Sequence, residues 1–231
     1  MPRCQLCDYV CPEAQQVSSL VCCWTCERRA RELPPEAVAA LVEMEAGTIE
    51  LDFWDWGWRP VAQPAEVVPG LFIGDLDHAC NVASLNNLGV CSVVNLCPDR
   101  LHGSYACCAS RLSSAGIWML TAPAHDSWNF NVVEQVLEGG VLEFIEGRMH
   151  RGGVLVNCWG GVNRSAAVVV AFLMLKQEES LLGAFRRTMG LRGTVLTNRS
   201  FRVQLLDLAL SRGCALGIAL QSGTTSGRSQ A

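Results

Sequence analysis

Short apolar runs alternate with longer helical stretches along the chain from about residue 65. The short runs are rich in β-branched side chains and bounded by turn-forming residues, which is typical of strands. They are EVVP (66–69), LFIG (71–74), CSVVNLC (91–97), IWMLTAP (117–123) and GVLVN (153–157). The stretches that favour helices lie near 77–88, 129–149, 165–177, 181–189 and 198–211. Strands separated by helices predict an α/β fold whose central, mostly parallel sheet is flanked by helices.

The longest expected helix, residues 129–149, has an apolar stripe with the period of an α-helix. Gly139 and Gly140 lie inside the stripe and lower the helix propensity there. We nevertheless expect the helix to continue through them.

The chain divides into four segments by composition. Residues 1–32 are rich in cysteine, and residues 33–64 hold a short helix and a tryptophan-rich linker. Residues 65–212 form the α/β domain. Residues 213–231 are small and polar and are expected to form a disordered tail.

The segment 33–64 contains two recognisable patterns. Pro35 opens and Gly47 closes a predicted helix over 35–46. Trp54, Trp56 and Trp58 then alternate with other residues, which is the period of an extended segment. We expect these tryptophans to pack the linker onto a domain, and an exposed docking motif is the alternative.

The composition restricts the classes of partner. A net charge of −4 provides no overall basic field for a nucleic-acid backbone, so no nucleic acid is expected as a partner. No stretch approaches the roughly 18 apolar residues of a membrane span, and the first residues lack the pattern of a secretory signal. We therefore expect an intracellular protein, cytoplasmic or nuclear, without a membrane span.

Six of the thirteen cysteines fall in the first 26 residues. Cys4 and Cys7 form one C-x2-C pair, and Cys23 and Cys26 form a second. Paired spacings of this kind are typical of a zinc site in which each pair supplies two thiolates. We expect residues 1–32 to form a zinc-binding module that resembles treble-clef and related zinc fingers and recruits a protein partner. The alternatives are ligation by Cys11 or Cys22 and a reduced segment without metal.

The remaining cysteines are expected to serve other purposes. In a reducing compartment a disulfide framework is disfavoured, so core packing and a catalytic thiol are the expected roles.

Residues 153–166, GVLVNCWGGVNRSA, join a buried strand to an apolar helix through a glycine-containing loop. Cys158 follows the strand, and Arg164 and Ser165 begin the helix. Ligands of open α/β sheets bind at this end of the strands. An inert core cysteine at a strand end is the alternative for Cys158.

The loop predicts a phosphate-binding site. Its backbone N–H groups point inward at a helix N-terminus, which suits an anion. Arg164 adds a planar fork that holds two phosphoryl oxygens at once. The same surroundings favour the thiolate form of Cys158, which is then a nucleophile facing phosphorus. The expected phosphate-binding residues are Trp159, Gly160, Gly161, Val162, Asn163 and Arg164.

Cys158, Gly161, Arg164 and Ser165 match the C-x2-G-x2-R-S core of the cysteine-dependent phosphatase signature. Residues 66 to about 210 resemble the dual-specificity protein phosphatases in particular. The segments that carry this resemblance are VVPGLFIGD (67–75), NLGVCSVVNL (87–96) and RGTVLTNRSFRVQLLDL (192–208). The resemblance implies the cysteine-dependent phosphatase fold and hydrolysis of phosphotyrosine, phosphoserine or phosphothreonine in a phosphoprotein substrate.

The resemblance also implies roles for single residues. Cys158 attacks phosphorus and forms a cysteinyl-phosphate, while Asp126, 32 residues earlier, protonates the leaving oxygen. Capping the helix near residue 129 is the alternative role for Asp126. Arg164 and the loop amides hold the transferring oxygens, and the Ser165 hydroxyl stabilises the departing thiolate. No cofactor is implied for this chemistry.

The chain departs from the family at Asn157, where histidine usually precedes the nucleophile. Asparagine cannot become cationic, so weaker activation of the Cys158 thiolate is expected.

Two functions other than a protein phosphatase stay open. A phosphoprotein-binding scaffold, or pseudophosphatase, is favoured by Asn157 and the zinc module. An RNA 5′-phosphatase of the same superfamily is favoured by Asn163 before the arginine and opposed by the net acidity.

Purified protein is expected to contain about one zinc ion per chain, held by Cys4, Cys7, Cys23 and Cys26. A chelator should unfold residues 1–32 and leave the α/β domain folded, because so short a module draws folding free energy on the order of 10 kcal/mol or more from its metal. Elemental analysis of the wild type and of a variant carrying Cys4→Ser and Cys7→Ser measures this. A metal-free wild type with an ordered N-terminal segment would contradict the assignment.

Overall fold

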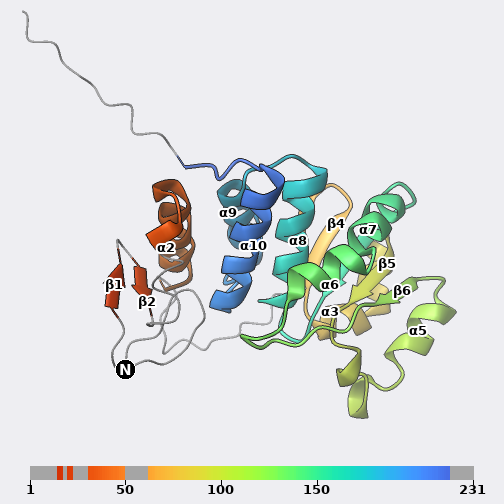
Figure 1. The fold of residues 1–231 in the computed structure, drawn as a ribbon. Coiled ribbons are helices and arrows are strands. Elements are labelled where there is room, and N and C mark those ends of the chain that lie inside the picture. Colours follow the sequence, from red (N-terminus) through yellow and green to blue (C-terminus); the bar gives the residue numbers. More distant parts are fainter. Residues whose placement is uncertain (1–14, 18–19, 23–30, 50–61, 219–231) are drawn as a thin grey trace, which may run out of the picture.

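A five-stranded sheet forms the centre of the computed structural model, which describes residues 15–17, 20–22, 31–49 and 62–218 (Figure 1). The strand order is β3 (Ala65–Val68), β4 (Leu71–Gly74), β7 (Gly153–Asn157), β5 (Val90–Asn95) and β6 (Trp118–Thr121). β3 pairs antiparallel with β4, and the other three pairings are parallel. The prediction of an α/β fold with a mostly parallel central sheet is confirmed.

Strand β7 lies in the middle of this sheet, and all five of its residues are buried. Its short, continuous apolar sequence is what a strand covered on both faces requires. The last residue, Asn157, is level with Gly74 of β4 and Asn95 of β5. The carboxyl ends of three strands therefore meet at one edge of the sheet, and Cys158 follows directly.

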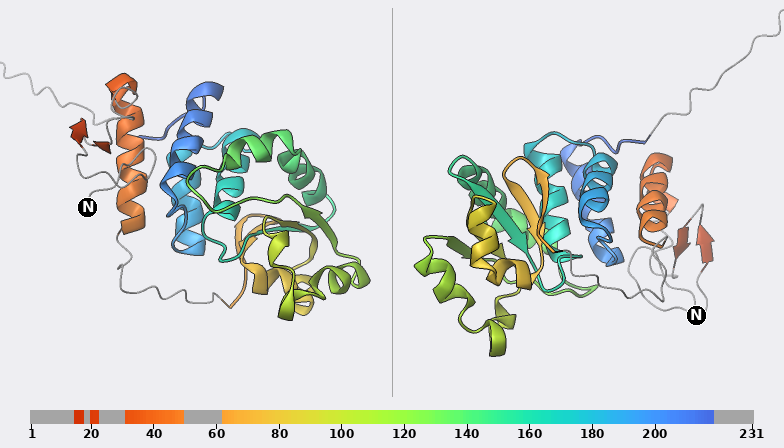
Figure 2. Two further views of the ribbon diagram at one scale, coloured as in Figure 1. Left: turned by 60° about the horizontal axis from the view of Figure 1, so that its bottom comes forward. Right: turned by 180° about the vertical axis from the view of Figure 1, so that it is seen from behind.

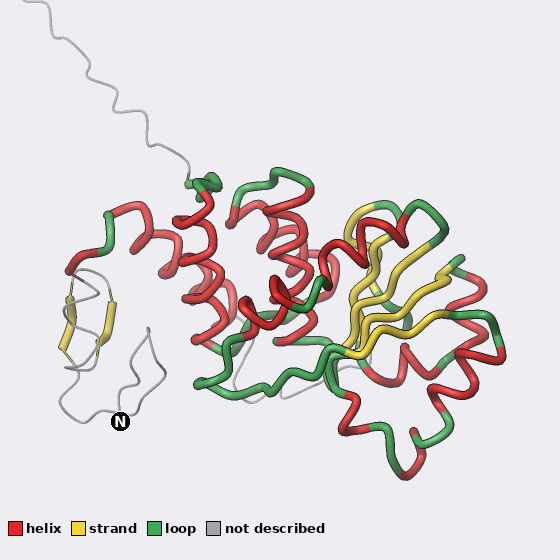
Figure 3. Tube along the Cα trace, turned by 45° about the vertical axis from the view of Figure 1, so that its right-hand side comes forward, coloured by secondary structure: helices red, strands yellow, loops and turns green. Residues whose placement is uncertain are grey.

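Helices cover both faces of the sheet (Figures 2 and 3). One face carries α3 (Leu76–Cys80), α4 (Val82–Asn87) and α5 (Cys108–Ser114), with short 3-10 helices η1 (Pro98–Arg100) and η2 (Gly103–Tyr105) before α5. The other face carries α6 (Val132–Glu138), α7 (Val141–Met149), α8 (Arg164–Lys176), α9 (Leu181–Arg192) and α10 (Arg199–Arg212). Helix α2 (Pro35–Ile49) packs outside α9 and α10.

Successive side chains of a strand point to opposite faces of the sheet, so the apolar side chains are divided between two cores, one on each face. On β7, Val154 and Val156 belong to the larger core, which includes α2 and α6 to α10. Leu155 belongs to the smaller core with α3, α4 and α5. Helix α8 is buried from Arg164 to Met174, because it lies between the sheet and the outer helices. This burial fixes the start of α8 firmly against the sheet edge.

Two glycines have roles that differ from the sequence prediction: Gly140 separates two helices, and Gly47 lies within a helix. The expected helix 129–149 is two helices, because Gly140 adopts a left-handed φ of +62° between α6 and α7. Gly47 lies inside α2, which continues to Ile49. A Cβ at Gly47 would lie 3.2 Å from Met189 Sδ and 3.2 Å from Phe185 Cε1. Glycine at this position therefore lets α2 approach α9 closely instead of ending the helix.

The segment near 77–88 also differs from its prediction as one helix. It is divided into α3 and α4 at Asn81, whose side chain accepts a hydrogen bond from Ser84 N at 3.1 Å. This local bond caps the start of α4, since it satisfies a backbone N–H that has no partner within the helix.

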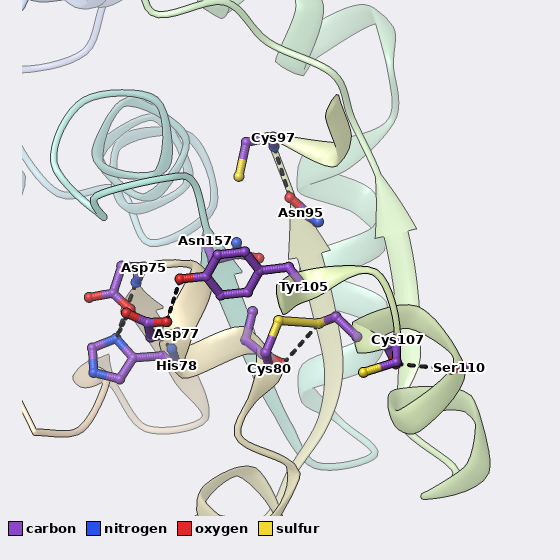
Figure 4. The surroundings of a disulfide bond; sticks show 12 residues. Asp75, Asp77, His78, Cys80, Asn95, Cys97, Tyr105, Cys107, Ser110 and Asn157 are labelled. Atoms are coloured by element: carbon purple, nitrogen blue, oxygen red, sulfur yellow. Dashed lines mark hydrogen bonds and ion pairs between the residues drawn. A yellow bond between two sulfur atoms is a disulfide. The ribbon is translucent and has the colours of Figure 1, made fainter. Parts of the chain in front are cut away.

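A disulfide joins Cys80 of α3 to Cys108 of α5 (Figure 4). The prediction that the cysteines serve only as metal ligands, core residues or a catalytic thiol is wrong for this pair. The sequence pattern does not predict α5, so the proximity of two cysteines 28 residues apart could not be inferred. The disulfide ties together two of the three helices that cover the smaller core.

Several sequence predictions lie outside the described residues. They are the zinc ligands Cys4, Cys7, Cys23 and Cys26, the tryptophans 54, 56 and 58, and the tail from residue 219. Near the N-terminus the structure describes a short antiparallel pair, β1 (Gln15–Val17) and β2 (Leu20–Cys22).

Residues 213–218, which the sequence places in the polar tail, contact α9 instead. Leu181 N and Leu182 N donate to Ala215 O at 2.9 Å and to Leu216 O at 3.0 Å. Among the residues that the structure describes, none of the helices has the length and apolar character needed to cross a bilayer.

Candidate active site

The loop of residues 158–164, here called the Cys158 loop, turns sharply over the end of β4. Gly161 has a φ of +66°, and a Cβ there would lie 2.7 Å from both the carbonyl carbon and the carbonyl oxygen of Gly74. Glycine alone combines a left-handed backbone with so close an approach. The loop therefore connects β7 to α8 in the tight turn that the sequence predicts.

Three polar groups converge at the start of α8. Cys158 is 1% exposed, and its Sγ lies 3.3 Å from Ser165 Oγ. Arg164 Nη1 donates to Ala124 O at 3.2 Å. The Arg164 Nε is buried and has no hydrogen-bond partner among the described residues. A cationic N–H without a hydrogen-bond acceptor, at a helix N-terminus beside a thiol, is suited to an anion.

Asp126, to which the family resemblance gives the role of general acid, lies beside this loop. Its Oδ2 accepts from Asn163 Nδ2 at 3.1 Å, and its Oδ1 accepts from Asn198 Nδ2 at 3.1 Å. The same Oδ2 lies 3.9 Å from Arg164 Nε. The carboxylate is thus held by two amides next to the guanidinium, and it does not cap α6. Asn131 caps that helix by accepting from Glu134 N.

A buried ion pair supports the other side of the loop. Arg192 Nη2 donates to Gly160 O at 3.1 Å and to Asp75 Oδ2 at 3.4 Å. Burial by itself would raise the pKa of the Asp75 carboxyl, but its contacts with His78 and the charge of Arg192 hold that pKa below its usual range. Burial lowers the pKa of Arg192, and the negative charge of Asp75 opposes this effect. The pair anchors the loop to the start of α3.

Asn157, which precedes Cys158, is completely buried. Its Nδ2 donates to Cys158 O at 3.4 Å, while its Oδ1 has no hydrogen-bond partner among the described residues. On the neighbouring strand, Asn95 Oδ1 accepts from Cys97 N at 2.8 Å, and Asn95 Nδ2 is likewise unpartnered within the described chain (Figure 4). Two neutral amides thus lie level with each other beneath Cys158.

Cys97 is a second buried thiol in this region. Burial and the negative charge of a Cys158 thiolate raise the pKa of Cys97 to about 12, although Arg164 acts in the opposite direction. Cys97 is therefore a neutral thiol at physiological pH. Sequence reasoning missed it, although its position just past the end of a strand parallel to β7 is a signal that could have placed it here.

Aromatic and cationic side chains surround the exposed part of the loop. The half-exposed Trp159 ring is edge-on to Tyr105, with ring centroids 6.0 Å apart, and the Arg100 guanidinium lies 5.3 Å from the Trp159 centroid. The Tyr105 hydroxyl donates to Asp77 Oδ1 at 2.7 Å. This aromatic group gives the approach to Cys158 an apolar wall.

A family model described as the catalytic domain of dual specificity phosphatases matches residues 71–209. The chain belongs to the dual specificity phosphatase family. The match extends from β4 to α10, and it contains Asp126, Cys158, Arg164 and Ser165. Helix α2 lies before it.

Individual dual specificity phosphatases agree with this match. Dual specificity protein phosphatase 26 of Rattus norvegicus is 37% identical over 145 residues, which cover 62% of this chain and 65% of the relative. Dual specificity protein phosphatase 4 of Gallus gallus is 30% identical over 175 residues, which cover 73% of this chain and 43% of the relative. The chain thus spans at most 65% of the length of these two relatives.

Solved structures show the same fold. The crystal structure of human DUSP28 is 26% identical, with a TM-score of 0.53, and the likeness covers 64% of this chain and 95% of that chain.

We expect Asp75→Asn to lower the free energy of unfolding by about 3 kcal/mol at pH 7, because removing one partner of a buried ion pair leaves the other charge uncompensated. The folded-state pKa of Asp75 is lowered, so this difference is fully present above the usual carboxyl pKa and disappears as pH falls through the folded-state pKa. Urea unfolding of wild type and variant at several pH values measures it. Asp99→Asn, in an exposed pair with Arg100, is the control. Equal losses in the two variants at pH 7 would contradict the expectation.

Proposed function

We propose that this chain hydrolyses phosphate monoesters of proteins through a cysteinyl-phosphate intermediate. The observation that carries the proposal is the convergence of three groups at the start of α8: the Cys158 thiol, the Ser165 hydroxyl and the Arg164 Nε, which has no hydrogen-bond partner in the described residues. The Asp126 carboxylate lies 3.9 Å from that Nε. The relatives named above are protein phosphatases, and they support the same activity for this chain.

In the first step, the Cys158 sulfur forms a bond to phosphorus while the bond from phosphorus to the substrate oxygen breaks. Asp126 donates its proton to that oxygen, so the tyrosine, serine or threonine hydroxyl departs neutral. Arg164 and the backbone N–H groups of residues 159–164 hold the nonbridging oxygens, whose charge is redistributed during transfer.

In the second step, Asp126 is a carboxylate and takes a proton from a water molecule. The water oxygen bonds to phosphorus while the bond from phosphorus to Cys158 breaks, which releases inorganic phosphate. Ser165 Oγ, 3.3 Å from Sγ, donates a hydrogen bond to the departing thiolate. These side chains supply the nucleophile, acid, base and charge stabilisation, so the proposed reaction requires no metal ion.

The proposed substrate is an intracellular phosphoprotein. The net charge of −4 supports a protein over a nucleic acid, and the Trp159 ring offers apolar surface for a phosphotyrosine ring or a neighbouring side chain of the substrate. For residues 1–32 we propose the zinc-binding module described above, separate from the α/β domain, as a site for a protein partner.

A phosphoprotein-binding scaffold is the second candidate function. Asn157 favours it, because this neutral amide leaves its buried Oδ1 without a partner in the described chain, where the family usually has a histidine. In such a protein the Cys158 loop would bind phosphate without turnover.

The protein is expected to hydrolyse p-nitrophenyl phosphate without added metal and to be inhibited by vanadate. Cys158→Ser should abolish turnover, because a serine hydroxyl is not ionised at neutral pH, while the affinity for inorganic phosphate persists. Steady-state kinetics and calorimetric phosphate titration measure the two properties. Cys107→Ser, at an exposed free thiol, is the control and should retain activity. Unchanged turnover of Cys158→Ser would eliminate Cys158 as nucleophile, and phosphate binding by an inactive wild type would favour the scaffold.

Arg164→Lys keeps the positive charge but loses the two-point contact with phosphoryl oxygens. We expect kcat/KM to fall by at least about 100-fold, near 2.7 kcal/mol. Arg187→Lys, which changes an exposed arginine paired with Glu179, should leave kcat/KM unaltered. A change of only a few-fold in the Arg164 variant would mean that this arginine has a structural role alone.

A further inference from the structure

We propose that Glu45 of α2 is a positioning residue for Asp126 and the Cys158 loop. It acts through a path of hydrogen bonds that crosses α10 and the loop between α9 and α10. This inference rests on the proposed phosphatase activity for its kinetic consequence, but its structural consequence can be measured without turnover. Helix α2 lies before the family match at 71–209, so the family comparison assigns it no role.

Glu45 is a buried carboxylate, only 8% exposed, that two arginines of α10 contact. Arg199 donates to Oε1 through Nε at 3.0 Å and through Nη2 at 2.6 Å. Arg202, whose side chain is 4% exposed, donates to Oε2 through Nη2. A buried carboxylate bound to two guanidinium groups fixes the rotamers of both arginines.

Arg202 continues the path toward the active site. Its Nη1 donates to Thr48 Oγ1 of α2 at 3.0 Å and to Leu196 O at 2.9 Å. Leu196 is fully buried and has a φ of +55°, a left-handed conformation that disfavours a residue with a side chain. Its N–H donates to Val162 O of the Cys158 loop at 2.9 Å. Bonds on both sides of Leu196 therefore hold a strained residue in place.

The two residues after Leu196 contact Asn163 of the Cys158 loop, and the second of them also contacts Asp126. Thr197 Oγ1 and Asn198 N both donate to Asn163 Oδ1, at 3.1 and 2.9 Å. Asn198 Nδ2 donates to Asp126 Oδ1. The orientation of the Asp126 carboxylate therefore depends on the backbone at 196–198, and that backbone depends on the guanidinium group that Glu45 holds.

Removing the charge of Glu45 has a definite consequence along this path. Arg199 and Arg202 would then lose the carboxylate that they share, and Arg202 would be held less firmly against Leu196 O. Leu196 is then free to leave its left-handed conformation, and Asn198 shifts away from Asp126. The general acid should be affected more than the nucleophile, because Asn198 contacts Asp126 directly.

The dependence of kcat on the leaving group of the substrate distinguishes a residue that positions Asp126 from one that only stabilises the fold. Phenyl phosphate, whose leaving group is basic, needs the proton from Asp126, whereas difluoromethylumbelliferyl phosphate has an acidic leaving group and needs it little. We expect Glu45→Gln to reduce kcat for phenyl phosphate by about tenfold and for the activated ester by less than about twofold, in the same sense as Asp126→Asn.

Glu43→Gln is the matched control. Glu43 lies on the same helix and forms an exposed ion pair with Arg186 of α9, and neither residue belongs to the path of hydrogen bonds described above. It should leave both substrates unaffected. Equal losses on the two substrates in Glu45→Gln, or the same result in both glutamate variants, would overturn the proposal. If Glu45→Gln does not fold, Glu45→Asp keeps the charge, shortens the reach and is expected to show the same substrate dependence to a smaller extent.

Hydrogen exchange of the full chain provides the readout that does not depend on turnover. The Leu196 amide, bonded to Val162 O, should exchange at least about tenfold faster in Glu45→Gln than in wild type or Glu43→Gln, below the unfolding transition of all three. If the Leu196 amide exchanges faster in Glu45→Gln but the wild type has no phosphatase activity, the proposed function is refuted and the positioning path is supported. If exchange of the Leu196 amide is the same in Glu45→Gln and in an active wild type, the positioning path is refuted and the proposed function is not.

Discussion

The close approach of the Cys158 loop to the end of β4 is the constraint on which the site depends. Because β4, β7 and β5 end at the same level, the chain leaving β7 must turn immediately over its neighbour. Gly161 makes this turn, since any Cβ there would lie 2.7 Å from Gly74 and equally close to Arg192 Nη2. The same crowding that excludes a side chain at Gly161 brings Arg192 within reach of Gly160 O.

Polar contacts then hold the loop from two sides. On one side, Arg192 joins Gly160 to Asp75 at the start of α3. On the other, Val162 O and Asn163 Oδ1 accept from the backbone of 196–198. The loop is thus fixed between the helices of the smaller core and the last two helices of the larger core. A loop held this way keeps its N–H groups oriented before any anion arrives, which is how preorganised electrostatic stabilisation operates.

The sequence predicts those parts of the site that are contiguous along the chain. Cys158, Arg164 and Ser165 belong to one strand, loop and helix, so local geometry alone brings them together. Asp75 and Arg192 are 117 residues apart, and Glu45 and Arg202 are 157 apart. Charged residues on amphipathic helices are ordinarily exposed, and periodicity does not indicate which of them tertiary packing will bury. The supports of the loop therefore became visible only in the folded structure.

Unpartnered polar atoms collect around the same loop. Of the five buried side-chain atoms without a partner in the described residues, four belong to Asn95, Asn157, Arg164 and Arg192. Each such group costs about 1–3 kcal/mol, a cost that the apolar cores must offset. At Arg164 an anion bound over Cys158 would supply the acceptor. At Asn157 and Asn95 the atoms without a hydrogen-bond partner are an acceptor and a donor on level positions of neighbouring strands. A neutral asparagine at position 157 avoids burying an uncompensated positive charge next to Cys158.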